Sequence, residues 1–570
     1  MLHRNLLHLP RENAADNRIC LRIHILERAG AAQCNQIPRL AIAISWVNTG
    51  VVNAWDSVLE VVTCCLRAGV SEFVVCAGAR NAALIEALAR AETAGKVRLW
   101  RHFEERSAGF FALGRCMETG LPCAVVTTSG TAAAELLPAV IEAHYQCRPL
   151  VAITADRPSA FRHSGAPQAI VQPGLFGGYA WQGGFSGWDG HGPVHLNVEL
   201  GESFEPASGD FFSQLTSGAF VPAKQRLDIA ALARWLRDDI HRGIVVLIGG
   251  LEPDEQEDVF HFCLDYGAPL VADATSGLRE ALQALAIHDA DRILKARPPG
   301  KILRLGEVPS GRFWRDLEDL PDVAVWSICR NGRPGLARQS QVTQGPLERV
   351  IPALGVIEAV GDACDLLVGA ASRAARTVEL LECYPDSEPA LLRVLSNFAA
   401  LGGGVFLGNS LPIREWNCFA QWTSPVKTVR ANRGANGIDG QVSTWLGWSA
   451  DVSDTWAVVG DLTALYDMAA PFVLGQVNCD GRVLAVINNC GGGIFTRLPR
   501  LRDMSPRAVE CMTNSHAADL SGLAALWGMR HLRVRTADDF DRLGVGTMPV
   551  LLEIVPDPEQ TARFWATCDR

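Results

Sequence analysis

The sequence predicts an α/β protein made of three doubly wound, parallel-sheet domains, and three observations lead to that fold class. Short apolar runs alternate with helix-like segments of about ten residues or more, which is typical of a parallel sheet covered on both faces. The alternation occurs in three successive blocks. The chain has 570 residues, of which 48% are hydrophobic and 20% charged, so each block can bury its own core.

The first block shows the alternation most clearly. It begins near residue 48, and its apolar runs are rich in Val, Ile and Leu. We assign residues 48–228 to this domain. Within it we expect helices over 54–68, 81–92, 106–117 and 132–144, and strands at 72–76, 97–100, 124–127 and 150–154.

Two further blocks repeat the pattern. The second opens with a strand at 243–249, followed by a helix over 254–266 and a strand at 269–272; the third has strands at 404–407, 428–431, 455–459, 483–488 and 550–554. Ser, Pro, Glu and Gln cluster near 205–228 and 380–400, where we expect linkers. The chain then divides into a central domain over 229–395 and a third domain over 396–570.

Residues 1–47 differ from the rest of the chain. They hold six arginines and have no regular apolar period. No continuous apolar stretch follows the basic start, as a secretory signal requires, and an organellar transit peptide would hold fewer acids and more serine. We interpret this segment as a disordered extension or the product of an upstream start codon, and we leave it out of the fold argument.

Composition excludes several classes of protein. Disorder, a fibrous repeat and a disulfide-held mini-protein do not fit a long chain with this apolar content. The net charge of −10 is spread along the chain, and an acidic protein of this kind is disfavoured as a nucleic-acid binder. No apolar run approaches the roughly 20 residues of a membrane helix, so we expect no membrane partner. The 17 cysteines form no CxxC pair, which indicates reduced thiols in a cytoplasmic protein.

The strongest chemical signal lies in the third block, at the ends of two predicted strands. One strand leads into Gly460–Asp461–Leu462, and the next ends in the run Asn488-Asn489-Cys490-Gly491-Gly492-Gly493. An acid, an amide and an exposed glycine carbonyl offer oxygen ligands that suit Mg²⁺ and leave positions for diphosphate oxygens. Glycine-rich turns at helix starts also present N–H groups to phosphate. Either half alone could be an ordinary strand end or turn. Their order and separation resemble the metal–diphosphate motif of thiamine-diphosphate enzymes.

Such an enzyme also needs a glutamate against the aminopyrimidine ring of its cofactor, supplied by a separate pyrimidine-binding domain. Residues 102–114 read His-Phe-Glu-Glu-Arg-Ser-Ala-Gly-Phe-Phe-Ala-Leu-Gly, so two acids follow a strand end and precede an apolar helix. Glu104 and Glu105 could simply be acids that the helix dipole favours in a first turn. With the metal motif in the same chain, Glu105 becomes the candidate for the cofactor-activating carboxylate.

Several longer strings carry a closer resemblance. They are AGARNAAL (77–84), HFEERSAGFFALG (102–114), TSGTAAAELLPAVIEA (128–143), TADRPSAFRHSGAPQAI (154–170), GNSLPIR (408–414), NRGANGIDG (432–440), GDLTALYD (460–467) and NNCGGGIF (488–495). In this order they resemble the 2-succinyl-5-enolpyruvyl-6-hydroxy-3-cyclohexene-1-carboxylate synthase family of menaquinone or phylloquinone biosynthesis. The resemblance runs from about residue 48 to the C-terminus. It implies a pyrimidine-binding, a central and a diphosphate-binding domain of the thiamine-diphosphate enzyme type.

The resemblance also implies cofactors and site residues. The cofactors are thiamine diphosphate and Mg²⁺ (or Mn²⁺), and the implied metal ligands are Asp461, Asn489 and the carbonyl of Gly491. Implied cofactor contacts are Glu105, Ser410, Ile438, Asp461, Leu462, Thr463, Asn489, Gly491, Gly492, Ile494 and Phe495. Implied substrate contacts are Arg80, Arg157, Gln168, Arg312, Ser410, Arg414, Arg433, Ile494, Phe495 and Leu498. The candidate catalytic residues are Glu105, Gln168, Arg414 and Arg433.

The implied substrates are 2-oxoglutarate and isochorismate, whose carboxylates suit two-pronged guanidinium groups. The implied reaction decarboxylates 2-oxoglutarate and adds the resulting succinic-semialdehyde carbanion to isochorismate by 1,4-addition. The family architecture implies a homodimer or homotetramer. Two departures bear on substrate binding: Ala79 stands where the family usually has a serine before Arg80, and Gly311 stands where a basic residue often precedes Arg312.

Other functions stay open from the sequence. The nearest alternative is another thiamine-dependent 2-oxo-acid lyase or synthase, similar to acetolactate synthase. A second is a non-catalytic relative that keeps the fold as a binding or assembly module, although Glu105, Asp461 and Asn489 argue against it. A nucleotide-binding Rossmann protein is disfavoured because Gly402–Gly404 precedes a predicted strand instead of following one.

Overall fold

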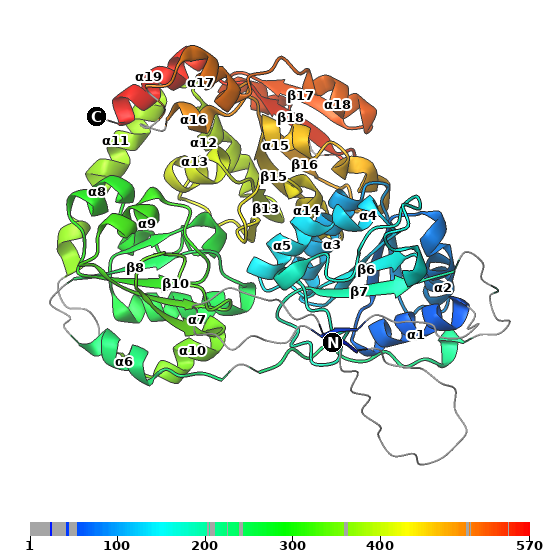
Figure 1. The fold of residues 1–570 in the computed structure, drawn as a ribbon. Helices are drawn as coiled ribbons and strands as arrows, with labels where there is room; N and C mark the ends of the chain where they lie inside the picture. Colours follow the sequence, from blue (N-terminus) through cyan, green and yellow to red (C-terminus); the bar gives the residue numbers. More distant parts are fainter. Residues whose placement is uncertain are drawn as a thin grey trace.

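The computed structural model describes residues 54–201, 205, 211–224, 226–238, 243–357, 363–497, 501, 503–544 and 546–569, with the backbone of two short strands near the N-terminus. Apart from that pair of short strands, the described residues form three separate sheets of five, five and six strands, in which all pairings are parallel. Figure 1 shows each sheet with helices around it and the three domains grouped about a common centre. The predicted three-domain parallel α/β fold is therefore confirmed.

The first sheet has the strand order β4-β3-β5-β6-β7. Neighbouring residues of β5 face opposite sides: Val125 joins the cluster around α3, whereas Ala124 and Val126 join the cluster around α1 and α2. Both faces are thus covered, as a parallel sheet requires. The strands are β3 Glu72–Val75, β4 Arg98–Arg101, β5 Cys123–Thr127, β6 Leu150–Asp156 and β7 Val194–Glu199; the helices are α1 Ala54–Arg67, α2 Ala82–Thr93, α3 Glu105–Thr119, α4 Thr131–Ala134 and α5 Leu137–Tyr145.

One expected helix of this domain, over 132–144, is divided in the structure. It forms the short α4 and the longer α5, which begins one residue before Pro138. Proline has no N–H to donate and is tolerated only in the first turn of a helix. The helix therefore starts anew at Leu137.

The central sheet has the order β12-β11-β10-β8-β9. Alternate residues of β8 again pack into two hydrophobic clusters on opposite faces of the sheet, Val246 into one and Val245 into the other. The strands are β8 Ile244–Ile248, β9 Leu270–Ala272, β10 Lys301–Leu305, β11 Ala324–Cys329 and β12 Gln341–Gln344; the helices are α6 Ala230–Arg237, α7 Pro253–Tyr266, α8 Ala290–Ala296, α9 Arg312–Asp316 and α10 Leu347–Leu354.

The third sheet has the order β14-β13-β15-β16-β18-β17. Its chain path reverses between β13 and β15, which leaves a topological switch point at the carboxyl ends of these strands. The strands are β13 Gly404–Leu407, β14 Val429–Arg430, β15 Thr455–Gly460, β16 Val483–Ile487, β17 Arg530–Val534 and β18 Val550–Ile554. The helices are α13 Leu411–Phe419, α14 Gln441–Trp448, α15 Asp461–Tyr466, α16 Gly493–Thr496, α17 Pro506–Thr513, α18 Leu520–Leu526 and α19 Pro558–Cys568.

The prediction of a linker near residues 380–400 is wrong. The segment is mostly helical, with α11 Ala370–Cys383 and α12 Glu388–Ala399. Ser387 accepts from the N–H of Ala390 and Pro389 lies in the first turn, so these residues start a helix. Leu391, Leu392 and Leu395 pack into the core of the third sheet. We therefore propose that the third domain begins before residue 396.

Helix α3 of the first domain and α14 of the third pack closely against each other, side by side in Figure 1. Two glycines allow the approach. A Cβ on Gly114 would lie 2.2 Å from the carbonyl oxygen of Thr444, and a Cβ on Gly447 would lie 2.1 Å from that of Phe111. Phe110 and Trp445 join one buried cluster across this contact. The first and third domains therefore share a continuous core.

The segment expected as an N-terminal extension contains two described strands. The strands β1 Ile23–Ile25 and β2 Ile42–Ile44 pair antiparallel; the remainder of residues 1–47 lies outside the described part of the chain. Among the described helices, none combines the length and the apolar character needed to cross a membrane.

Candidate functional site

The predicted site residues of the third domain follow the carboxyl ends of four neighbouring strands. Arg433 follows β14, Ser410 follows β13, Asp461 follows β15 and Asn489 follows β16. Because these strands are adjacent and parallel, all four residues lie along one edge of the sheet, around the switch point. The structure therefore gathers residues that are far apart in the sequence.

Asp461 is the first residue of α15 and is almost completely buried. One carboxylate oxygen accepts from the N–H of Leu462 at 2.6 Å, and the other accepts from the N–H of Gly491 at 2.8 Å. Burial raises the pKa of Asp461 above its usual range, and these hydrogen bonds oppose that rise. The carboxylate is thus fixed between two backbone segments, with lone pairs left for a cation.

Asn489 presents an acceptor that the fold leaves unused. Its Oδ1 is buried and has no hydrogen-bond partner among the described residues, whereas its Nδ2 donates to Glu388. A buried acceptor without a partner is costly and marks a place for an ion or water. With the Asp461 carboxylate and the Gly491 carbonyl it gives an oxygen donor set, so these residues fit Mg²⁺ or Mn²⁺.

The backbone at Gly491 requires glycine. Its φ is +141°, and a Cβ there would lie 2.6 Å from the carbonyl oxygen of Thr513. The next residue, Gly492, donates its N–H to the same Thr513 oxygen at 2.6 Å. The glycine run therefore lets this loop approach residues 513–516 closely and brings His516 to Asp461, with 3.2 Å between Nε2 and Oδ2.

Glu105 begins α3, directly after the cap residue Glu104. The Glu104 side chain accepts from the N–H groups of Arg106 and Ser107 and caps the helix, which leaves the Glu105 carboxyl for another use. Burial, together with Glu104 and Glu135 nearby, raises the pKa of Glu105. A perturbed pKa of this kind is typical of acids at functional sites. Of the two acids, the structure therefore favours Glu105 as the chemically active one.

Two other first-domain candidates share this sheet edge. Arg80 follows β3 and donates to the carbonyl oxygen of Leu200 at 3.1 Å. Arg157 follows β6, with its guanidinium 5.2 Å from the centre of the Phe161 ring.

Gln168 belongs to the same part of the first domain. It adopts φ +54°, and its backbone lies beside Gly130, where a Cβ would approach it to 3.2 Å. Gly130 follows β5 at the carboxyl edge of the first sheet. Gln168 and the two arginines therefore extend the edge on which Glu105 lies.

A cluster of arginines lies beside the switch point of the third sheet. Arg433 is buried and donates from Nη1 to the side-chain oxygen of Asn409 at 2.8 Å. Arg414 of α13 donates to the carbonyl oxygen of Ser410, the residue that precedes this helix. Burial, Arg433 and Arg315 all lower the pKa of Arg414. Positive groups crowded in a buried place indicate a site for anionic groups.

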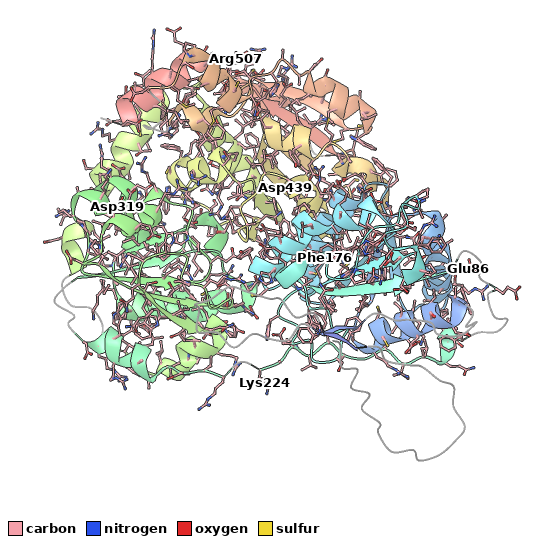
Figure 2. The ribbon with its side chains drawn as sticks, in the orientation of Figure 1. Glu86, Phe176, Lys224, Asp319, Asp439 and Arg507 are labelled. Atoms are coloured by element: carbon pink, nitrogen blue, oxygen red, sulfur yellow. The ribbon has the colours of Figure 1, made fainter. Side chains whose placement is uncertain are left out.

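Ser410 and Asn409 shape this region through the backbone. Ser410 adopts φ +72°, an uncommon conformation for a residue with a side chain. The amide of Asn409 donates to the carbonyl oxygens of Asn432 at 2.7 Å and Gly437 at 2.8 Å. The loop with Arg433 and Ile438 is therefore tied to the end of β13. Figure 2 labels Asp439, the neighbour of Ile438, near the middle of the molecule.

The central domain is joined by hydrogen bonds to α13, the helix that contains Arg414. Asn417 donates to Asp273 at 3.1 Å and to Ser310 at 2.7 Å, and it accepts from the N–H of Ala274. Arg312 is more exposed, at 55% of its side chain, and lies 3.6 Å from Asp316. Arg315, three residues further along, is the central-domain arginine whose charge lowers the pKa of Arg414.

The remaining predicted cofactor and wall residues lie on the same edge of the third domain. Leu462 and Thr463 are in the first turn of α15, and Gly492 immediately precedes α16, which contains Ile494 and Phe495. Leu498 lies outside the described residues.

Several residues of the site were not predicted from the sequence. Glu142 of α5 accepts from the N–H groups of Gly434 and Ala435, both at 2.7 Å. Burial raises the pKa of Glu388 to about 7, and burial with Glu388 nearby raises that of Glu415 well above its usual range. These acids lie in apolar helices, where no local motif distinguishes them. Asn409 was missed too, although it stands next to the predicted Ser410 inside the quoted string GNSLPIR.

Comparisons with known proteins agree with this geometry. The family described as "Thiamine pyrophosphate enzyme, N-terminal TPP binding domain" matches residues 57–175. A 2-succinyl-5-enolpyruvyl-6-hydroxy-3-cyclohexene-1-carboxylate synthase of Akkermansia muciniphila is 50% identical over 519 residues, covering 88% of this chain and 96% of the relative. One of Bdellovibrio bacteriovorus is 35% identical over 530 residues, covering 88% and 96%. The benzoylformate decarboxylase structure from Polynucleobacter necessarius has a TM-score of 0.65 at 11% identity, covering 88% of this chain and 98% of that one, and shows the shared fold.

Proposed function

The chain belongs to the 2-succinyl-5-enolpyruvyl-6-hydroxy-3-cyclohexene-1-carboxylate synthase family, and from that premise we propose how its own residues carry the reaction. It is a thiamine-diphosphate-dependent decarboxylating carboligase of menaquinone biosynthesis. We propose that its substrates are 2-oxoglutarate and isochorismate. The product is then 2-succinyl-5-enolpyruvyl-6-hydroxy-3-cyclohexene-1-carboxylate, with release of CO₂.

The third domain would hold the cofactor through a divalent cation. Asp461, Asn489 and the Gly491 carbonyl supply the oxygen ligands for Mg²⁺ or Mn²⁺, and the unpartnered Oδ1 of Asn489 supports this assignment most directly. Leu462, Thr463 and Gly492 would approach the diphosphate with their backbone, while Ser410, Ile438, Ile494 and Phe495 would contact the organic part. Thiamine diphosphate, when bound, supplies the ability to stabilise the carbanion that decarboxylation leaves.

Glu105 would exchange a proton with the aminopyrimidine ring of the cofactor. Burial and the neighbouring acids raise its pKa, and a carboxyl with a raised pKa is suited to exchange a proton with the ring. Its position after β4, on the carboxyl edge of the first sheet, agrees with a role at a ligand-binding edge.

The arginines would bind and orient the carboxylates of both substrates. Arg414 and Arg433 lie together at the switch point, and Arg80, Arg157 and Gln168 lie on the corresponding edge of the first sheet. Guanidinium groups match carboxylates with two parallel hydrogen bonds. Apolar side chains such as Ile438 and Phe495 would exclude water from the centre where CO₂ leaves. Arg312 would reach the same substrates from the central domain.

We propose that two copies of the chain share each site, in a homodimer or homotetramer. The acids that perturb Glu105 belong to its own first domain, while the hydrogen bonds to Asp461 come from the third domain. Near Glu105, Phe103, Tyr466 and Met468 are at least half exposed. Such a patch of large apolar side chains is typical of an interface. The cytoplasmic location inferred from the cysteines stays a prediction.

The observation that carries this proposal is the 50% identity over almost the full length of a curated synthase. The direct test follows isochorismate consumption by ultraviolet absorbance with 2-oxoglutarate present. Consumption should require both thiamine diphosphate and Mg²⁺ or Mn²⁺. Turnover of pyruvate without turnover of 2-oxoglutarate and isochorismate would instead indicate a different thiamine-dependent lyase.

Mixing two inactive variants tests the shared site. Glu105→Gln and Asp461→Ala enzymes, unfolded and refolded together, should regain activity because some mixed dimers contain one unaltered site. If neither variant gains activity on mixing while sedimentation shows mixed dimers, each chain would have to contain its own complete site.

A further inference from the structure

One side of the Asn489 amide is held by a buried carboxylate that the proposed reaction does not use. Glu388 is the first residue of α12 and is 3% exposed. Its two carboxylate oxygens lie 3.2 Å and 3.0 Å from Nδ2 of Asn489. The two residues are 101 positions apart in the sequence, so the contact depends on how α12 packs against the end of β16.

The chemistry of the pair determines which way the amide faces. Of the two ends of an asparagine amide only the nitrogen donates, and both Glu388 oxygens accept from Nδ2 in the structure. Nδ2 must therefore face Glu388, and Oδ1 must face the opposite direction. That Oδ1 is the buried atom without a partner among the described residues. Without Glu388, either end of the amide could face the cation.

Glu388 is itself held in place. Glu415 of α13, 1% exposed, lies beside it, and neither oxygen of Glu415 has a hydrogen-bond partner among the described residues. Two buried carboxyl groups can hydrogen-bond when one carries the proton. The order Glu415, Glu388, Asn489 thus links α13, which also contains Arg414, to α12 and to the loop after β16.

We propose that Glu388 is a positioning residue for the divalent cation: it accepts from Nδ2 of Asn489 and so keeps Oδ1 turned toward the metal. The inference rests on the proposed function, in which Asn489 is a metal ligand. Glu388 itself does not contact the metal. Residues that orient metal ligands through hydrogen bonds typically affect metal affinity by 10- to 100-fold.

The alternative role for Glu388 is purely structural, as a support between α12 and the sheet. Both roles predict some loss of stability when it is replaced, so unfolding alone does not distinguish them. They differ in what happens to cation affinity, and in whether an uncharged acceptor at the same position is sufficient. An amide at 388 can still accept from Nδ2, whereas a thioether cannot hold the amide in one orientation.

The test measures Mn²⁺ binding by electron paramagnetic resonance, with thiamine diphosphate present and no substrate. We expect Glu388→Met to raise the dissociation constant of Mn²⁺ by about 10- to 100-fold, and Glu388→Gln to stay within about threefold of the unaltered protein. Glu255→Met is the matched control, because Glu255 is equally buried but lies in the central domain. It should lower stability without changing Mn²⁺ affinity.

A second variant pair keeps the test valid if Glu388→Met does not fold. Asn489→Asp places two carboxylates against each other and should bind Mn²⁺ weakly. Adding Glu388→Gln gives the acid a donor, so the double variant should regain at least about fivefold in affinity. Unchanged affinity in Glu388→Met, or no recovery in the double variant, would overturn the inference. If the unaltered protein itself fails to bind Mn²⁺ with thiamine diphosphate, the proposed metal site fails instead.

Discussion

The guanidinium of Arg433 donates to the side-chain oxygen of Asn409 across 2.8 Å, between residues that follow neighbouring strands. The same asparagine donates to two backbone oxygens of the Arg433 loop. Its side chain therefore fixes both the direction of the guanidinium and the path of the loop behind it. Arg433 retains other N–H groups, including a buried Nε without a hydrogen-bond partner among the described side chains. The arrangement presents a fixed, two-pronged donor.

Replacing Arg433 with lysine should weaken substrate binding more than it weakens the cofactor site. A lysine keeps the charge but loses the planar pair of donors, and a lost hydrogen bond to a charged group costs about 1.5–3 kcal/mol. We expect Arg433→Lys to raise KM about 10- to 100-fold for at least one substrate. Steady-state kinetics measures it. Arg507→Lys, at an exposed position that Figure 2 labels at the upper edge of the molecule, should leave KM unchanged.

Glu105→Gln should lower kcat while leaving the fold intact. The amide keeps the shape of the side chain but cannot exchange a proton, and such exchange typically contributes 10²- to 10⁴-fold to rate. Isochorismate consumption at saturating thiamine diphosphate measures the loss. Glu104→Gln is the neighbouring control: it alters the cap of α3, so we expect about 1 kcal/mol of lost stability and a much smaller change in rate. Full activity in Glu105→Gln would contradict the assignment.

The features that sequence reasoning found are local ones. Strand ends followed by Gly-Asp or Asn-Asn were predictable because the apolar period and the polar residue after it lie within about ten positions. Glu142 and Glu388 were missed because their partners lie 292 and 101 positions away. The misplaced linker has a local cause: Ser387, Glu388 and Pro389 suit a loop by composition, yet they are also a helix start. Packing of α12 against the third sheet decided between the two.

Glu142→Gln should loosen the Arg433 loop from the first domain. The carboxylate gives one oxygen to each of two backbone N–H groups, and it also accepts from Gln146. An amide offers only one accepting oxygen, so a buried donor loses its partner, at a cost of about 1–3 kcal/mol. Urea unfolding should show that loss, and KM should rise. Equal stability and equal KM in the variant would show that the loop is held by its other contacts.

Gly114→Ala should disrupt the packing of α3 on α14. The added methyl would meet the Thr444 carbonyl oxygen at 2.2 Å, a backbone atom that cannot move aside easily. Overpacking of this kind costs about 1–3 kcal/mol or more, and we expect at least that much from urea unfolding. Gly522→Ala is the control, in a helix where a Cβ meets nothing within 4 Å. Its alanine should be neutral or stabilising, by up to about 1 kcal/mol.

Stability should fall below neutral pH partly because His195 is buried without charge. His195 lies on β7, beside Thr154 and Gln182, and burial lowers its pKa to about 3. The unfolded chain protonates this residue near pH 6.5. Between about pH 6.5 and 3 the unfolded state therefore binds more protons than the folded state, and stability decreases as pH falls. At pH 5 this one residue should account for about 2 kcal/mol of lost stability, at 1.36 kcal/mol per pH unit.

His195→Gln isolates that contribution, because the amide can hydrogen-bond but does not titrate in this range. The variant should be less stable than the unaltered protein at pH 7, since its packing differs, but its stability should depend less on pH. Urea unfolding at pH 7 and pH 5 gives the two differences, and the fall in the variant should be smaller by about 2 kcal/mol. His102, whose pKa burial lowers to about 4, is present in both proteins and cancels. The same fall in both would mean that His195 becomes protonated in the folded state already near pH 6.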